Sequence, residues 1–200
     1  MKKKLVIALS GATGVIYGIR LLGYLREMER VETHLILSHW AEENIEIETP
    51  YDVQEVKNLA DYCYGNHELG ARISSGSFGV SGMVIVPCSM KTLSAVACGY
   101  ADSLIARCAD VSLKERRRLI IVPRETPLNT IHLENMLRLS RMGVDIVPPM
   151  PSFYHRPETI DDLITHFCGR VLDLMEIPNP LSSRWQGAQR IRSHVGEGEA

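Results

Sequence analysis

The sequence predicts a three-layer α/β domain of the flavodoxin or Rossmann type, doubly wound around a mainly parallel sheet. Short apolar runs alternate with segments of helical periodicity along the whole chain. Several of these runs are apolar without interruption, which is typical of strands that helices cover on both faces of a parallel sheet. The first run leads directly into a turn with two glycines, SGATG, and then into a helical pattern. Together these three observations favour this fold class over all-α and all-β alternatives.

The elements follow from the same patterns in chain order. Strands are expected at residues 4–9, 31–37, 83–87, 118–122 and 144–147. Helices are expected at residues 15–29, 53–62, 89–98, 103–117, 130–142 and 158–176. Asn129 is expected to cap the helix over 130–142 and Gly143 to end it. Residues 1–186 are assigned to one flavoprotein-like domain and 187–200 to a polar tail whose composition is compatible with disorder.

Composition argues against several classes of function. The chain has 200 residues, 45% of them hydrophobic, and a formal net charge of −2 with both signs interspersed. The length and hydrophobic content fit one compact domain. The charge balance argues against a nucleic-acid surface, which would have a basic stripe. The apolar run after the initial lysines has about five residues, short of the roughly 7–15 of a signal peptide, and none reaches the about 18 of a membrane span. We therefore expect a cytoplasmic protein without a membrane partner.

The cysteines indicate neither disulfides nor a metal site. Their number is odd, and no CxxC pair or His/Cys cluster has the spacing of metal ligands. They are Cys63, Cys88, Cys98, Cys108 and Cys168. Reduced, mostly buried thiols are expected, with no metal. Cys88 follows a strand, but no histidine lies near it in sequence, so we interpret it as a packing residue rather than a nucleophile.

The turn SGATG is a candidate anion site. Gly11 and Gly14 allow a tight turn and a close approach of the backbone to a ligand, and the following helix directs its N–H groups there. The spacing GxxG, with a further Gly18, is weaker than GxGxxG, so a turn without a ligand stays an alternative. The second strand ends at Ser38 and not at an acidic residue that would hold a dinucleotide ribose. A mononucleotide such as FMN therefore fits better than NAD.

Further polar residues follow the other strands and form one predicted rim, because ligands of such sheets bind beyond the carboxyl ends of the strands. They lie in the segments 38–40 (SHW), 87–89 (PCS), 123–125 (PRE) and 153–155 (FYH). Arg107 and Lys114 lie at the border of an apolar helical stripe, and Arg170 lies at the border of another. Such cations are often ion-paired or snorkelling. With Arg124 and Tyr154 they would also suit a second phosphate.

A long ordered series of motifs resembles the UbiX-like flavin prenyltransferases, in particular the branch associated with hydroxyarylic (phenolic) acid decarboxylases. The motifs are SGATGVIYG, ISSGSFG (73–79), PCSMKTLSAVACGYADSLIARCADVSLKERR (87–117), VPRETPLNTIHLENMLRLSRMG (122–143), PPMPSFYHRPET (148–159) and RW (184–185). They cover about residues 4–186. The resemblance implies a flavodoxin-like fold, bound FMN and a homo-oligomer, a dodecamer in the family. It also implies metal-independent transfer of the dimethylallyl group of dimethylallyl phosphate to reduced FMN. The product, prenylated FMN, would serve a UbiD-type decarboxylase.

The resemblance also assigns site residues. It implies FMN contacts at Gly11, Ala12, Thr13, Gly14, Ser38, Ser89, Met90, Thr92 and Arg124. It implies prenyl-phosphate contacts at Ser75, Arg107, Lys114, Arg124, Tyr154 and Arg170. It implies catalytic roles for Glu48, Lys114, Glu125 and Trp185. Many members have serine in the first loop where this chain has Thr13, and the hydroxyl is kept.

These residue types suit a prenyl transfer. Arginine, lysine and tyrosine donors stabilise the charge that gathers on a leaving phosphate, and the face of Trp185 can stabilise an allylic cation. Glu125 and Glu48 are candidates for handling the proton that leaves the flavin. A hydrophobic plug is the alternative for Trp185, and a solvated carboxylate is the alternative for Glu48. Two other functions stay open: a non-catalytic FMN-binding component of a phenolic acid decarboxylase complex, and a flavin-dependent cysteine decarboxylase-like enzyme.

Overall fold

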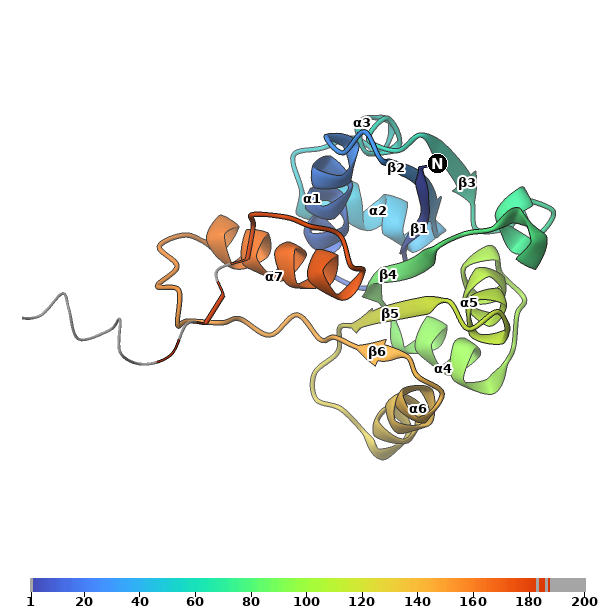
Figure 1. The fold of residues 1–200 in the computed structure, drawn as a ribbon. Coiled ribbons are helices and arrows are strands. Elements are labelled where there is room, and N and C mark those ends of the chain that lie inside the picture. Colours follow the sequence, from blue (N-terminus) through green and yellow to red (C-terminus); the bar gives the residue numbers. More distant parts are fainter. Residues whose placement is uncertain (1, 183, 186, 188–200) are drawn as a thin grey trace, which may run out of the picture.

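Six parallel strands form a single sheet that helices cover on both faces (Figure 1). The computed structural model describes residues 2–182, 184–185 and 187. The strands are β1 (Lys3–Leu9), β2 (Val31–Leu37), β3 (Tyr62–Gly65), β4 (Gly82–Cys88), β5 (Arg118–Pro123) and β6 (Asp145–Ile146). Their order is β3-β2-β1-β4-β5-β6, and each neighbouring pair is parallel. The predicted fold class is confirmed.

The helices connect these strands, and the direction of winding reverses between β1 and β4. They are α1 (Val15–Arg26), α2 (His39–Glu48), α3 (Val53–Lys57), α4 (Met90–Cys98), α5 (Leu104–Lys114), α6 (Thr130–Arg141) and α7 (Ile160–Leu174). Two 3-10 turns, Arg72–Ser74 and Gly76–Phe78, lie between β3 and β4. The loops after β1 and β4 leave the sheet on opposite sides of this reversal, which is the usual ligand position in doubly wound sheets.

Alternate residues of the central strands feed two separate cores. On one face Leu5 and Ile7 of β1 pack with α1, α2, α3 and α7. On the other face Val6 and Ala8 pack with α4, α5 and α6. The alternation follows from the two-residue period of a strand. Helices α5 and α7 therefore cover opposite faces of the sheet (Figure 1).

One strand and one α-helix were not predicted from the sequence. The expected helix over 53–62 ends at Lys57, and Tyr62–Gly65 forms the edge strand β3 instead, with Tyr62 opposite His34 of β2. The segment YCYG is half exposed and lacks the apolar run that marks the other strands. Helix α2 buries only Ala41 and Ile45, so its periodicity is weak. The other predicted elements agree with the structure except at their ends.

Helix α1 packs closely against the sheet. A Cβ atom on Gly18 would lie 2.5 Å from the carbonyl oxygen of Val86 and 2.9 Å from the side chain of Leu9. Only glycine lets α1 approach β1 and β4 this closely.

Of the predicted tail, residues 188–200 lie outside the described residues. Within the described part of the chain, no helix is long and apolar enough to cross a membrane.

A buried histidine ties the edge strand to the sheet. His34 of β2 is fully buried, with Nε2 2.9 Å from Oε1 of Glu32 and Nδ1 3.1 Å from Oη of Tyr64. Its ring stacks on Tyr62 at a centroid distance of 5.0 Å. Burial lowers the pKa of His34, and the nearby cation of Arg72 lowers it further, although Glu32 acts in the opposite direction. The imidazole is therefore neutral at neutral pH.

This burial predicts a pH-dependent stability. The unfolded chain regains the ordinary pKa of 6.5, so it binds a proton more readily than the folded chain does. The contribution of His34 is thus fully present above about pH 6.5 and is lost as the pH falls through the lower folded pKa. We expect urea unfolding to show a smaller drop in the free energy of unfolding between about pH 7.5 and 5 for His34→Gln than for the wild type. Equal drops for the two proteins would contradict this assignment.

Candidate active site

The turn after β1 has a backbone that only glycine adopts easily. Gly14 caps α1 in the left-handed region with φ of 92°. A Cβ atom on Gly11 would lie 2.5 Å from Cβ of Trp40, so the first turn of α2 passes directly over this glycine. Thr13 lies exposed between the two glycines and Ala12 is half exposed. The turn thus presents backbone and one hydroxyl to solvent at the start of α1.

An acidic side chain already lies at this helix end. The Gly14 amide donates to Oε2 of Glu48, the last residue of α2, at 2.8 Å. A carboxylate is favourable there because the N-terminus of a helix carries partial positive charge and unpaired N–H groups. The contact indicates that the β1–α1 turn favours a negatively charged group, which is what a phosphate site requires.

One buried hydroxyl joins this turn to the turn after β4. Ser10 Oγ donates to the carbonyl oxygen of Pro87 at 3.1 Å and accepts from the Ser89 amide at 2.8 Å. Ser89 then caps α4, because its Oγ accepts from the Thr92 amide at 3.3 Å and lies 3.2 Å from the Thr92 hydroxyl. The start of α4 is therefore held beside the start of α1.

Ser38, directly after β2, connects the start of α2 to the end of β1. Its amide donates to the carbonyl oxygen of Leu9 at 3.1 Å, and its Oγ caps α2 by accepting from the Ala41 amide at 3.1 Å. Helices α1, α2 and α4 thus all begin at one edge of the sheet, and a hydroxyl residue lies at each start. Three positive helix ends and short polar side chains fit the phosphate and polar groups of a mononucleotide such as FMN.

The loop after β5 adds charge to this edge. The Arg124 amide donates to the carbonyl oxygen of Cys88 at 3.1 Å, which fixes Arg124 and Glu125 beside the turn after β4. Both side chains are exposed, and Oε1 of Glu125 accepts from the Thr126 amide at 3.0 Å. Within the described residues, no ion pair is found for Arg124. Met90, the first residue of α4, is half buried at the same edge.

The structure supports the interpretation of Cys88 as a packing residue rather than a nucleophile. The thiol is fully buried, and its Sγ donates weakly to the carbonyl oxygen of Ser89 at 3.5 Å. Burial raises the pKa of the Cys88 thiol, so the reactive thiolate is disfavoured. Cys108 and Cys168 are also buried, and burial raises the pKa of each to about 12. These thiols pack in the interior, as expected from the sequence.

A second group of predicted site residues gathers on α7. Oη of Tyr154 lies 2.8 Å from Nε2 of His166, and the ring of Trp185 meets the Tyr154 ring edge-on at a centroid distance of 5.8 Å. Arg170 follows His166 by one helical turn and pairs with Asp173 at 3.1 Å. Tyr154 and Trp185 were expected at the rim or beside the flavin. In this chain Tyr154 contacts His166 of α7, and Trp185 contacts Tyr154.

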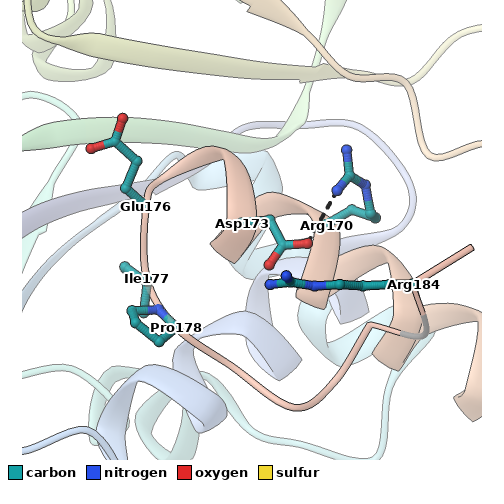
Figure 2. Close-up of a pocket in the computed structure, with 6 residues that line it drawn as sticks. All are labelled: Arg170, Asp173, Glu176, Ile177, Pro178 and Arg184. Carbon is teal, nitrogen blue, oxygen red and sulfur yellow. Dashed lines mark hydrogen bonds and ion pairs between the residues drawn. The ribbon is translucent and has the colours of Figure 1, made fainter. Parts of the chain in front are cut away.

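A cavity of about 590 Å³ adjoins this group at the end of α7 (Figure 2). Arg170 and Arg184 lie on either side of the Asp173 carboxylate (Figure 2). That carboxylate also accepts from Ser182 Oγ and Asn179 Nδ2, both at 3.0 Å, which holds the chain after α7 against the helix. The remaining lining residues are Glu176, Ile177 and Pro178.

A third group lies on α5. Arg107 pairs with Asp110 at 2.9 Å and Lys114 with Glu115 at 3.2 Å. Ser75 is exposed, with its Oγ 2.9 Å from that of Ser77. Its segment lies along α5, where Cys108 Sγ contacts the carbonyl oxygen of Ile73 at 3.5 Å.

The cations Arg107, Lys114 and Arg170 do not lie together within one chain. Arg107 and Lys114 lie on α5, and Arg170 lies on α7, on the opposite face of the sheet. Each cation lies at the partly exposed border of its helix, as the apolar stripes predicted. A stripe does not show which face of the sheet its helix covers, so the separation of the cations was not predicted. Within one chain the predicted site residues thus fall into three groups, at the edge of the sheet, at α7 and at α5, and their convergence across copies of the chain stays a prediction.

Two contacts were missed from the sequence. The bond between Glu48 and the Gly14 amide joins residues far apart in the chain and left no local signal. The contact between His166 and Tyr154 did have a local signal. His166 lies within the apolar stripe of its helix between Leu163 and Phe167, where a polar residue needs a partner.

Among the described residues, no three His, Cys, Asp or Glu side chains are grouped closely enough to hold a metal ion.

Comparison with known proteins places the chain in a family. It matches the family model described as "Flavoprotein" over residues 1–171. A "Probable UbiX-like flavin prenyltransferase" of Escherichia coli O157:H7 is 54% identical over 196 residues, 98% of this chain and 100% of that protein.

Two solved structures are similar over nearly their whole length. One is a "dodecameric FMN-dependent Ubix-like Decarboxylase" from Escherichia coli O157:H7, with 56% identity, a TM-score of 0.90 and coverage of 92% of this chain and 100% of that one. The other is "AnUbiX (PadA1) in complex with FMN and dimethylallyl pyrophosphate", with 49% identity, a TM-score of 0.92 and coverage of 94% and 100%. The chain therefore belongs to the Flavoprotein family and, within it, to the UbiX-like flavin prenyltransferases.

Proposed function

We propose that this chain is a prenyltransferase that moves the dimethylallyl group of dimethylallyl phosphate onto reduced FMN. The allylic C–O bond breaks, phosphate leaves, and the reduced flavin supplies the nucleophile, so that prenylated FMN is the product. The observation that carries the proposal is the meeting of three helix N-termini at the edge that Arg124 and Glu125 border. Relatives at about half identity carry the name of this activity, and one similar structure contains both FMN and a dimethylallyl donor.

FMN is assigned to the edge of the sheet. The turn from Gly11 to Gly14 and the helix ends capped by Ser38 and Ser89 would hold its phosphate and polar groups, because backbone N–H groups there lack helical partners. The full set of proposed contacts is Gly11, Ala12, Thr13, Gly14, Ser38, Ser89, Met90, Thr92 and Arg124. Glu48 and Glu125 border the same edge, where one of them can accept the proton that leaves the flavin.

We assign the donor to a site that several copies of the chain complete. Arg107 and Lys114 have side chains 38% and 50% exposed, so α5 can present them to a neighbouring copy. One similar structure is described as dodecameric, which supports a homo-oligomer here. The proposed phosphate contacts are Ser75, Arg107, Lys114, Arg124, Tyr154 and Arg170. Their donors stabilise the charge that collects on the phosphate as the allylic bond breaks.

Trp185 is assigned to the allylic fragment. Its ring is 56% exposed and lies edge-on to Tyr154, so a face stays available for a cation. An aromatic face stabilises positive charge without forming a bond to it. Lys114 would act as a point charge on the phosphate, and its ion pair with Glu115 is exposed and easily rearranged.

The product has a recipient outside this chain. We propose that prenylated FMN passes to a UbiD-type decarboxylase of hydroxyarylic acids, and that both proteins work in the cytoplasm. The five cysteines support this location because all are free, and disulfides are rare in reducing compartments.

One anaerobic incubation tests the proposed reaction. The protein is mixed with reduced FMN and dimethylallyl phosphate, and the flavin is analysed by mass spectrometry. We expect a flavin heavier by one C5 prenyl unit. An unchanged flavin mass would contradict the proposal. Release of CO2 from a phenolic acid by this protein alone would instead identify a decarboxylase.

Glu125→Gln separates binding from chemistry. The variant should bind FMN as the wild type does, because the amide keeps the shape of the side chain. Its rate of prenylated FMN formation should fall by about 100-fold or more, since a positioned acid or base contributes about that factor. Glu134→Gln, the same change on an exposed residue of α6, is the matched control and should leave the rate unchanged. A wild-type rate for Glu125→Gln would remove this residue from the mechanism.

Mixed oligomers test whether two copies share one site. Arg107→Ala and Arg170→Ala should each be inactive alone. After dissociation and reassembly at equal amounts, a site that takes Arg107 from one copy and Arg170 from another has both arginines in about one quarter of cases. About a quarter of the wild-type activity should therefore return. Complete absence of recovery in verified mixed oligomers would place both arginines in the same chain's site.

A further inference from the structure

The hydroxyl of Tyr154 is held by a buried imidazole. Oη of Tyr154 lies 2.8 Å from Nε2 of His166, which is only 5% exposed. The His155 ring stacks on His166 at a centroid distance of 4.2 Å and an angle of 18°. Since α7 fixes the backbone of His166 and the stacked ring fixes its plane, the imidazole has little freedom to turn away from Tyr154.

The phenol is held on a second side as well. The Trp185 ring meets the Tyr154 ring edge-on at 5.8 Å and 80°. Tyr154 thus lies between α7 and the segment after it. Its position along the chain, between β6 and α7 in a segment without regular structure, would not by itself fix the direction of the hydroxyl.

The surroundings of His166 favour its uncharged form. Burial lowers the pKa of His166, and the neighbouring His155 and Arg170 lower it further. A neutral imidazole has one N–H group. If Nε2 carries that hydrogen, it donates to the Tyr154 oxygen, and the Tyr154 O–H can donate to a phosphate. The opposite tautomer would consume the phenol hydrogen and turn a lone pair toward the donor.

We propose that His166 is a positioning residue that holds the Tyr154 oxygen through Nε2–H and so directs the Tyr154 hydrogen toward the phosphate of the prenyl donor. This inference rests on the proposed contact between Tyr154 and that phosphate. His166 itself touches neither substrate. Arg170, one turn along α7, reaches the same phosphate, so α7 supplies both an aimed hydrogen bond and a positive charge.

Matched substitutions test the inference. His166→Gln keeps an N–H group near the position of Nε2, whereas His166→Leu removes it and His166→Asn is too short to reach. We measure kcat/KM for dimethylallyl phosphate, and also its Kd by calorimetry with oxidised FMN bound. His166→Leu and His166→Asn should lower kcat/KM and the affinity for dimethylallyl phosphate by about tenfold each. This is the effect expected when one hydrogen bond that serves a charged phosphate is lost. His166→Gln should stay within about threefold of wild type.

A double-mutant cycle shows whether His166 acts through Tyr154. Tyr154→Phe should cost about as much as His166→Leu, and the double variant should be no worse than Tyr154→Phe alone. His155→Phe keeps the stacked ring and is the control, with both constants expected near wild type. The affinity for FMN should stay unchanged in all variants, which separates a local effect from misfolding.

Three results would overturn the inference. One is that His166→Leu has the kcat/KM and Kd of the wild type while Tyr154→Phe is impaired. Another is that the effects of the two substitutions are fully additive in the double variant. The third is equal impairment of His166→Gln and His166→Asn, which would indicate a packing role alone. A wild-type Tyr154→Phe would refute the proposed phosphate contact itself, and the positioning role would fall with it while the prenyl transfer stood.

Discussion

The tight turn between β1 and α1 is the constraint on which the rest of the site depends. Gly14 adopts a left-handed backbone, and Gly18 lets α1 lie against β1 and β4. The buried hydroxyl of Ser10 bonds to both Pro87 and Ser89, so the turns after β1 and β4 cannot move apart without breaking these bonds. The N-termini of three helices are thereby collected at one edge, and we infer that this edge is an anion site made largely of backbone.

The chemistry that follows is divided between parts of the fold. The edge proposed for the flavin lies within one chain, but three of the cations proposed for the donor, Arg107, Lys114 and Arg170, lie on α5 and α7, across the sheet from each other. Two phosphates close together repel, so the second one needs positive charge beyond that of Arg124, which is proposed to contact both ligands. We propose that arginines and lysines on the outer helices meet that need when copies of the chain assemble. Assembly would then be a condition of catalysis and not only of stability.

Much of the fold was predictable from the sequence, because strands buried on both faces are apolar throughout and SGATG marks the first strand–helix junction. The meeting of the polar turns at one edge was also predictable, because residues that directly follow parallel strands must meet at one end of the sheet. Strand β3 and helix α2 were missed since half-exposed elements leave little hydrophobic pattern. The separation of Arg107 from Arg170 and the bond between Tyr154 and His166 were not predictable, because both depend on how distant segments pack.

We propose that the backbone turn and its neighbouring helix ends bind the phosphate of FMN. Comparing the affinities of the protein for FMN and for riboflavin, which lacks the phosphate, tests it most directly. Several charge-assisted hydrogen bonds should favour FMN by about 100-fold or more, and Gly14→Ala should remove most of that preference because alanine is strained at a φ of 92°. Equal affinity for the two flavins in the wild type would contradict the account.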